Sequence, residues 1–210
     1  SALKYKEEKV LELREMVRKG NNAAAEKALE KVEKYNRILK KEVSKYNVPV
    51  VELIEARTED PFKVLISTIL SARTKDEVTS IASRNLFKKV KKFKDFKKIS
   101  VKEVEKLIYP VGFYKTKAKH VKELSNIILN KFDGKVPNTF EELTSLPGVG
   151  RKTANCVLVY AYEKPAIPVD IHVHRISNRL GLVDTKNPEE TEQELMRKIK
   201  KKYWIDINDT

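Results

Sequence analysis

Residues 146–175 read LPGVGRKTANCVLVYAYEKPAIPVDIHVHR, and this stretch decides the fold. Two glycines, Gly148 and Gly150, stand immediately before an apolar run that predicts a helix over residues 151–162. Glycine permits a sharp turn there, because it adopts backbone angles that other residues avoid. The stretch therefore predicts two helices joined by a tight hairpin.

The turn before this expected helix has the features of an anion site. Backbone N–H groups at the start of a helix lack intrahelical partners and lie at the positive end of the helix dipole. We therefore expect Gly148, Val149, Gly150 and Arg151 to contact one phosphate without reading a base. The alternative interpretation is a glycine-rich corner between two helices that binds no ligand.

Lys152 and Asp170 are the candidate catalytic residues of this stretch. The start of a helix disfavours a cation, and so favours the neutral amine that a nucleophile needs. Asp170 follows an extended apolar segment and can stabilise a developing positive charge or transfer a proton. The plainer alternatives are a solvated or phosphate-contacting lysine and an aspartate that only caps the next helix.

Outside this stretch, apolar residues recur every three or four positions and alternation is scarce, which predicts an all-α protein. The helix expected at residues 62–72 is the most apolar of the first half and should lie in the core. The other expected helices cover residues 4–19, 23–46, 49–56, 76–89, 115–132, 151–162, 171–180 and 188–203, with short helices after residues 100 and 139.

Four short patterns mark where helices begin. Asp60 before Pro61 and Asn187 before Pro188 each place a capping side chain next to a proline at the first helical position. The segments SVKE (100–103) and TFEE (139–142) are typical capping boxes.

The chain is strongly basic, with 44 Lys and Arg against 30 Asp and Glu and a net charge of +14. Residues 73–135 hold eighteen Lys and Arg against seven Asp and Glu, and so carry +11 of this excess. Such a surface is typical of a protein that binds nucleic acid. A solvated lysine-rich surface is the alternative. His120 lies on a lysine-rich expected helix and should be solvated.

The single cysteine, Cys156, excludes an intramolecular disulfide, a CxxC redox pair and a cysteine-held metal cluster within this chain. No apolar run approaches the roughly 18 residues of a membrane-spanning helix, and the start of the chain has no apolar signal region. We therefore expect an intracellular protein with no membrane partner. His172 and His174 stand two apart, point to different sides of a helix and are not expected to bind metal.

Residues 146–175 resemble the helix-hairpin-helix and catalytic segment of the base-excision DNA glycosylases, specifically their endonuclease III branch. The segments LISTILSARTKD (65–76) and VGFYKTKA (111–118) extend the resemblance, which covers roughly residues 35–205. The resemblance implies a base-excision repair DNA glycosylase with AP lyase activity. Such an enzyme removes oxidised pyrimidines from damaged double-stranded DNA and nicks the abasic site by β-elimination.

The resemblance also implies an all-α fold of two helical lobes with a DNA-binding cleft between them. One lobe would hold residues 61–165 with the hairpin, and the other residues 1–60 and 166–210. We expect a monomer that works in the cytoplasm or nucleoid, or in the nucleus of a eukaryote. Two other functions stay open: a mismatch or oxidised-purine glycosylase of the same superfamily, and a non-catalytic helix-hairpin-helix module that binds DNA.

By the same resemblance, Lys152 is the nucleophile and Asp170 the essential carboxylate. Relatives that only remove the base lack a lysine at this position, so Lys152 indicates the bifunctional type. Relatives usually hold an iron–sulfur cluster with four cysteines near the C-terminus. This chain has no cysteines that could serve, and we expect it to carry no cofactor and no metal.

Two further segments are expected to enter the DNA. Arg73 stands where relatives carry a glutamine, and Phe113 where they often carry a leucine. Phe113 should fill the gap that a flipped-out base leaves, because an apolar wedge replaces part of the lost stacking. Arg73 should fill the same gap or contact the opposite base. A buried core position is the alternative for Phe113. His172 and Arg175 form the HxxR motif of the family and are expected to contact DNA.

Overall fold

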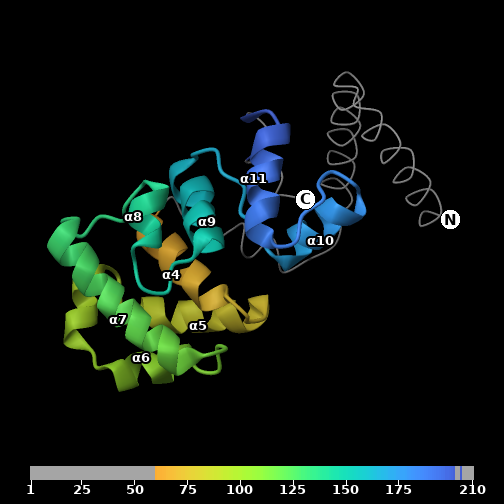
Figure 1. Ribbon diagram of the computed structural model, residues 1–210. Coiled ribbons are helices and arrows are strands. Elements are labelled where there is room, and N and C mark those ends of the chain that lie inside the picture. The colour runs from red at the N-terminus through yellow and green to blue at the C-terminus, as the bar shows by residue number, and fades with distance from the viewer. Residues whose placement is uncertain (1–59, 202–203, 205–210) are drawn as a thin grey trace, which may run out of the picture. The chain divides into compact units, whose positions relative to one another are not determined.

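The computed structural model describes residues 60–201 and Trp204, and every regular element in that part is a helix (Figure 1). The helices expected at residues 4–19, 23–46 and 49–56 lie outside the described residues. The all-α class is confirmed. In chain order the elements are α4 (Pro61–Ser71), α5 (Asp76–Lys89), the 3-10 helix η1 (Phe93–Lys98), α6 (Val101–Ile108), α7 (Tyr114–Lys131), α8 (Phe140–Thr144), α9 (Arg151–Tyr162), α10 (Ile171–Arg179) and α11 (Pro188–Lys198).

The described residues belong to two compact units. The larger unit contains residues 60–168, with α4 through α9. The smaller unit contains residues 169–201 and Trp204, with α10 and α11. The two lobes expected from the sequence stay a prediction, because residues 1–59 lie outside the description.

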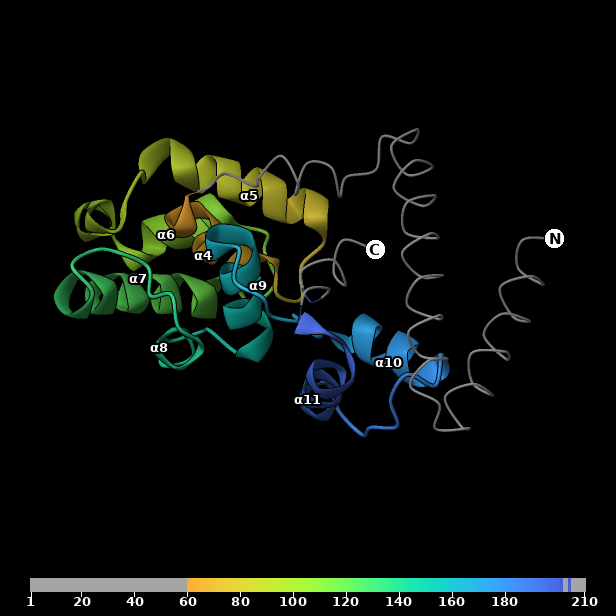
Figure 2. The ribbon, with the colours of Figure 1, turned by 90° about the horizontal axis from the view of Figure 1, so that it is seen from above.

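Helix α4 is the centre of the larger unit. It packs against α5, α7 and α9, and Figure 2 shows it running between α5 and α9. Three of its side chains, Leu65, Ile66 and Leu70, are completely buried. A helix that is apolar on most sides is stable only when other helices surround it. The central position expected for this segment is therefore confirmed.

A cluster of phenylalanines joins the first turn of α4 to η1. The ring of Phe62 lies 4.8 Å from that of Phe93 in an edge-to-face arrangement and 6.4 Å from that of Phe96. Both rings of η1 are buried. Side chains three residues apart align on a 3-10 helix, so this short element buries both rings on one side. Sequence periodicity missed η1, because lysines surround the two phenylalanines.

Polar side chains fix both ends of η1. The carboxylate of Asp95 accepts hydrogen bonds from the backbone N–H groups of Lys91 and Lys92, at 3.0 and 3.2 Å. The bond from Lys91 is the main reason why the pKa of Asp95 lies below its usual value. At the other end, Nζ of Lys122 on α7 donates to the carbonyl oxygens of Phe96 and Ile99.

The helix starts agree with the capping patterns, with one difference. Asp60, Ser100 and Asn187 each accept a backbone N–H from the first turn, and Ser100 forms a full capping box with Glu103. Thr139 also caps its helix, accepting from the Glu142 N–H at 3.3 Å. Its hydroxyl, however, donates to the Glu142 carboxylate at 2.7 Å, so the expected reciprocal bond goes to a side chain.

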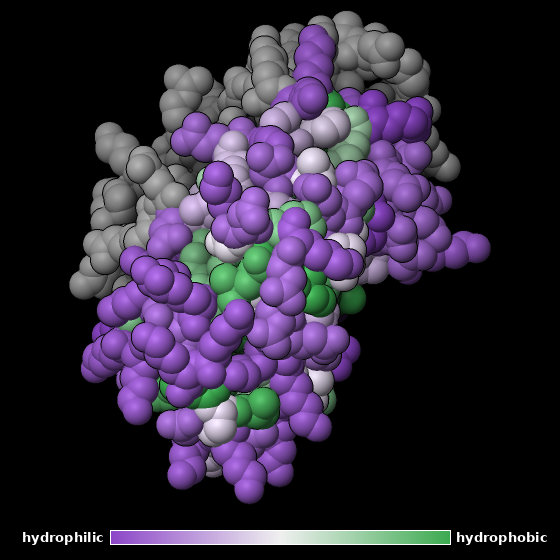
Figure 3. Space-filling view, turned by 90° about the vertical axis from the view of Figure 1, so that its left-hand side faces the viewer, coloured by the Kyte–Doolittle hydropathy of each residue, from purple (hydrophilic) through white to green (hydrophobic). Residues whose placement is uncertain are grey.

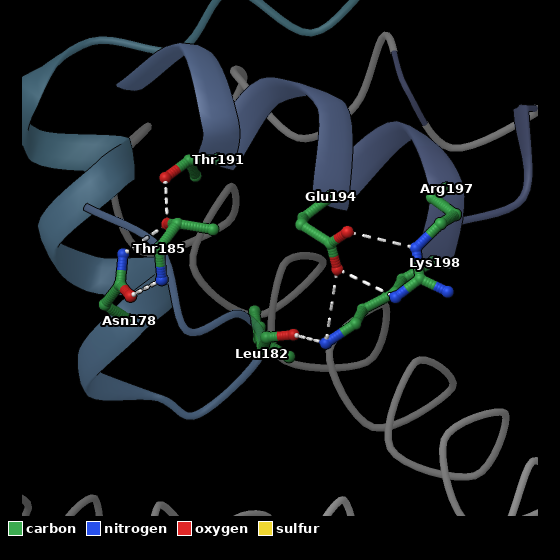
Figure 4. A network of polar contacts seen from close by, with 7 residues as sticks. All are labelled: Asn178, Leu182, Thr185, Thr191, Glu194, Arg197 and Lys198. Carbon is green, nitrogen blue, oxygen red and sulfur yellow. Dashed lines mark hydrogen bonds and ion pairs between the residues drawn. The ribbon is translucent and has the colours of Figure 1, made fainter. Parts of the chain in front are cut away.

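Hydrogen bonds join α10 to the rest of the smaller unit. Nδ1 of His174 lies 2.6 Å from Oγ1 of Thr191, at the start of α11. Asn178 donates to Oγ1 of Thr185 at 3.0 Å and accepts from the Thr185 N–H at 2.8 Å (Figure 4). These bonds hold α10, and with it Asp170 at its start, in a defined orientation within this unit.

Helix α11 ends earlier than expected. Ile199 is extended, with φ −101° and ψ 133°, so the helix ends at Lys198 and does not reach residue 203. Basic residues occupy its last turn: Arg197 pairs with Glu194 at 2.8 Å, and Nζ of Lys198 donates to the Leu182 carbonyl at 2.9 Å (Figure 4). Cations are favourable at this end of a helix.

Candidate functional site

The hairpin between α8 and α9 has the expected tight turn. Val149 N–H donates to the Leu146 carbonyl at 3.1 Å, and Gly148 adopts a φ of +79°, which side chains disfavour. Gly150 has an ordinary φ of −92° and caps α9. A Cβ on Gly150 would meet no atom within 4 Å. The backbone at Gly150 is therefore open to an approaching group.

His120 supports this hairpin from α7. A Cβ added to Gly148 would lie 2.8 Å from Nδ1 of His120, closer than real Cβ contacts allow. His120 is half-buried, so the expectation of a solvated histidine was wrong. The reason is tertiary packing: one side of the lysine-rich α7 faces the hairpin.

The first residues of α9 present a cationic side chain next to the turn. Lys152 is exposed, and Arg151 is half-buried with its guanidinium 4.6 Å from the centre of the Phe140 ring. Val149 is buried and holds the turn to the core. The positive end of α9 thus lies at the open backbone of Gly150, as a phosphate site requires.

Asp170 caps α10. Its Oδ1 accepts the backbone N–H groups of His172 and Val173, both at 2.9 Å. The cap expected from the sequence is confirmed. His172 and Arg175 are both exposed on the same helix. Lys152 belongs to the larger unit and Asp170 to the smaller, so their meeting in one site stays a prediction.

Arg73 and Phe113 come together in the larger unit. Arg73 follows α4 with a φ of 55°, and Phe113 precedes α7 with a φ of 57°. The guanidinium carbon of Arg73 lies 5.7 Å from the centre of the Phe113 ring, within the range of a cation–π contact. Phe113 is 63% exposed, which contradicts the core alternative.

Sequence reasoning missed Lys117, which connects these two turns. Its Nζ donates to the carbonyl oxygens of Leu70 and Ala72, at 2.8 and 2.6 Å, and lies 3.2 Å from Oγ1 of Thr74. The side chain is buried, and burial lowers its pKa from 10.5 to about 8. One signal was available, because Lys117 lies one helical turn before the buried Val121 on α7.

The face of the described residues that Figure 3 shows is largely hydrophilic, with apolar patches between the polar side chains. The lysine-rich stretch of residues 73–135 lies entirely within the larger unit. This unit therefore combines the basic excess, the glycine hairpin and the Arg73–Phe113 pair.

The residues present do not fit an iron–sulfur cluster. The chain has one cysteine, and Cys156 is buried in α9. Within residues 60–201, no group of three or more His, Cys, Asp or Glu is placed to hold a metal ion. Nδ1 of His174 is engaged with Thr191. The expectation that this chain carries no cofactor stays a prediction.

Among the described residues, no helix is long and apolar enough to cross a membrane.

Comparison with known proteins agrees with this arrangement. Residues 66–201 match the HhH-GPD superfamily of base excision DNA repair proteins, and the chain belongs to that superfamily. Within it, the chain is similar to endonuclease III. The endonuclease III of Thermotoga maritima is 50% identical over 149 residues, which are 71% of this chain and 70% of that protein.

Two solved structures extend the similarity to the fold. A non-covalent endonuclease III–DNA complex has a TM-score of 0.72 at 33% identity, covering 85% of this chain and 81% of the other. A trapped endonuclease III–DNA covalent intermediate has a TM-score of 0.68 at 38% identity, covering 70% of each chain. The resemblance expected from the sequence is confirmed.

Proposed function

We propose that this chain is a DNA glycosylase with AP lyase activity. It removes an oxidised pyrimidine from damaged double-stranded DNA and then cuts the strand at the abasic site. The observation that carries the proposal is the exposed Lys152 on the first turn of α9, beside the open backbone of Gly150, in a chain that is 50% identical to an endonuclease III over 149 residues.

Lys152 supplies the nucleophile. Its neutral amine attacks C1′ of the flipped nucleotide, a C–N bond forms, and the base leaves with the electrons of the glycosidic bond and takes up a proton. The sugar ring then opens to a Schiff base. Loss of a C2′ proton expels the 3′ phosphate by β-elimination, and water hydrolyses the Schiff base to release Lys152.

Asp170 stabilises the positive charge that builds on the sugar as the base leaves. The hydrogen bonds that cap α10 orient its carboxylate, because Oδ1 accepts two backbone N–H groups at 2.9 Å. The His174–Thr191 contact supports the same helix. We propose that this carboxylate and the Lys152 amine act on one sugar.

Binding to the duplex is divided among the remaining residues. The hairpin at Gly148 and Gly150 holds one phosphate, and His172 and Arg175 contact the backbone from α10. Arg73 carries several N–H donors in a fixed plane and can hydrogen-bond the base left unpaired. These contacts need one copy of the chain, and we expect a monomer located with the DNA of the cell.

A panel of duplex oligonucleotides tests the proposal. The panel contains an oxidised pyrimidine, an oxidised purine, a mismatched thymine and a preformed abasic site, and base release is measured separately from strand cleavage. We expect release of the oxidised pyrimidine and nicking of the abasic site. Preference for the purine or the mismatch would favour the related glycosylases. Equal binding of all duplexes without chemistry would favour the binding module.

A further inference from the structure

The turns that carry Arg73 and Phe113 touch through their backbones. A Cβ on Gly112 would lie 2.6 Å from the carbonyl oxygen of Arg73, so only glycine permits this approach. The backbone N–H of Gly112 donates to Oγ1 of Thr74 at 3.1 Å. Gly112, next to Phe113, therefore packs on the backbone of Arg73, and Thr74, next to Arg73, accepts a hydrogen bond from Gly112.

Lys117 makes a second connection between the two turns. An ammonium group has three N–H donors, and here two carbonyl oxygens and one hydroxyl surround it. The carbonyls of Leu70 and Ala72 belong to the end of α4, where carbonyl groups lack intrahelical partners and a cation is favourable. Lys117 thus bonds α7 to the end of the helix that leads into Arg73.

Thr74 is common to both links. Its hydroxyl oxygen accepts the Gly112 N–H, lies 3.2 Å from the Lys117 ammonium, and is 3.3 Å from the Ala72 carbonyl. One hydroxyl therefore joins the Arg73 turn, the Phe113 turn and α7. Replacing this hydroxyl by a methyl group would break the bonds to Gly112 and Lys117 and conserve the shape, while the bonds from Lys117 to the Leu70 and Ala72 carbonyls would remain.

The two side chains held in this way are arranged before DNA is present. Arg73 and Phe113 both have left-handed backbone angles, which non-glycine residues keep only where the surrounding structure holds them. Their cation–π contact spans 5.7 Å, and the ring is 63% exposed. Two long side chains therefore stand together at the surface of the larger unit.

We propose that Arg73 and Phe113 enter the DNA together as one preassembled wedge, and that Thr74 and Lys117 are positioning residues that keep the two turns at a fixed separation. This inference rests on the proposed function, because a wedge acts when a nucleotide leaves the stack. Groups fixed in advance lose less conformational entropy when they insert than flexible groups do. The links therefore speed the extrusion of the base.

A double-substitution cycle tests whether the two side chains act as a unit. Single-turnover excision of an oxidised pyrimidine is measured for Arg73→Ala, Phe113→Ala and the double variant. If the wedge is one unit, each change slows excision about tenfold and the double variant is scarcely slower, because the effects do not add. A double variant slowed about a hundredfold would overturn the inference.

Thr74 provides a matched pair of variants. Thr74→Ser keeps the linking hydroxyl, and Thr74→Val removes it with the same shape. Wedge insertion is followed by the fluorescence of 2-aminopurine placed beside a stable abasic analogue in a duplex. We expect insertion about tenfold slower for Thr74→Val and near-normal for Thr74→Ser, because one hydroxyl link is lost only in the former. Equal rates for the two variants would overturn the positioning role.

A separate measurement isolates the proposed function. A single-stranded oligonucleotide with an abasic site needs no wedge, so the wild type and both Thr74 variants should nick it alike. No nicking by the wild type would speak against the lyase, whereas the fluorescence would still report the wedge. Nicking that falls in parallel with insertion in Thr74→Val would mean general damage to the site, and would overturn the inference.

Discussion

The imidazole of His120 lies against Gly148, so helix α7 supports the hairpin that begins α9. The two residues are 28 positions apart, and neither side chain nor spacing indicated the contact. The two hairpin glycines are thus under different structural constraints. Gly148 is required by its φ of +79° and by the packing of His120, whereas Gly150 is surrounded by open space.

This difference predicts that substitutions at the two glycines affect different properties, the stability of the fold and the binding of DNA. Gly148→Ala should lower the free energy of unfolding by about 1 to 3 kcal/mol, because Cβ is strained and strikes the histidine. Gly150→Thr keeps a capping residue and should change stability by less than about 0.5 kcal/mol. It should still weaken binding to damaged and undamaged duplexes alike, since a side chain then stands where the phosphate approaches. Chemical denaturation and fluorescence anisotropy measure the two effects. Weaker binding of damaged duplexes alone would contradict the phosphate role.

Lys152→Ala should abolish covalent trapping by borohydride on abasic-site DNA, because only an amine forms a Schiff base. The residue is exposed, so stability should change by less than about 0.5 kcal/mol. Lys119→Ala, at another exposed lysine of the same unit, is the control and should trap normally. Undiminished trapping by Lys152→Ala would place the nucleophile elsewhere.

Two substitutions separate the charge of Asp170 from its cap. Asp170→Asn keeps an oxygen for the His172 and Val173 N–H groups but removes the charge, so the fold should remain stable while base removal slows. Nicking of a preformed abasic site should slow less. Asp170→Ala should cost in addition about 1 kcal/mol of stability. Equal slowing of both reactions by Asp170→Asn would rule out a role specific to base departure.

Lys117 predicts a pH dependence of stability. Its pKa is about 8 in the folded state, against 10.5 for an unperturbed lysine. Between these values the unfolded chain binds a proton that the folded state has released, so the free energy of unfolding should rise with pH. Below pH 8 both states are protonated and this contribution is constant. Denaturation from pH 7 to 10.5 measures the slope, and Lys117→Met should lack this part of it. Equal slopes in both proteins would contradict the lowered pKa.

Much of the fold was predictable because its signals are local. The expected helices at residues 76–89 and 151–162 match α5 and α9 to the residue. Helix α9 begins at a glycine cap, and α5 has acidic residues in its first turn and lysines in its last, as the helix dipole favours. Asp60 and Ser100 cap where their side chains indicated.

The remainder depends on contacts between residues distant in sequence. Lys117 resembled the other lysines of its segment, because its burial depends on the end of α4, more than forty residues earlier. The local sequence pattern did not predict the 3-10 helix η1, because lysines surround its two phenylalanines. Both rings pack against Phe62, about thirty residues earlier in the chain. Of the candidate site, the hairpin and the Asp170 cap could be read from the sequence, whereas the cross-link between the two turns could not.

The phenylalanine cluster of η1 has a consequence for protein engineering. The segment from residue 88 to 98 reads as a lysine-rich surface loop that an engineer would shorten or exchange without concern. Phe93 and Phe96, however, pack against Phe62 in the first turn of α4, and the Lys122 ammonium donates to the carbonyl oxygen of Phe96. Deletion of this segment would therefore expose apolar side chains at the edge of the core. Single substitutions of the exposed lysines would instead change the surface charge and leave the fold intact.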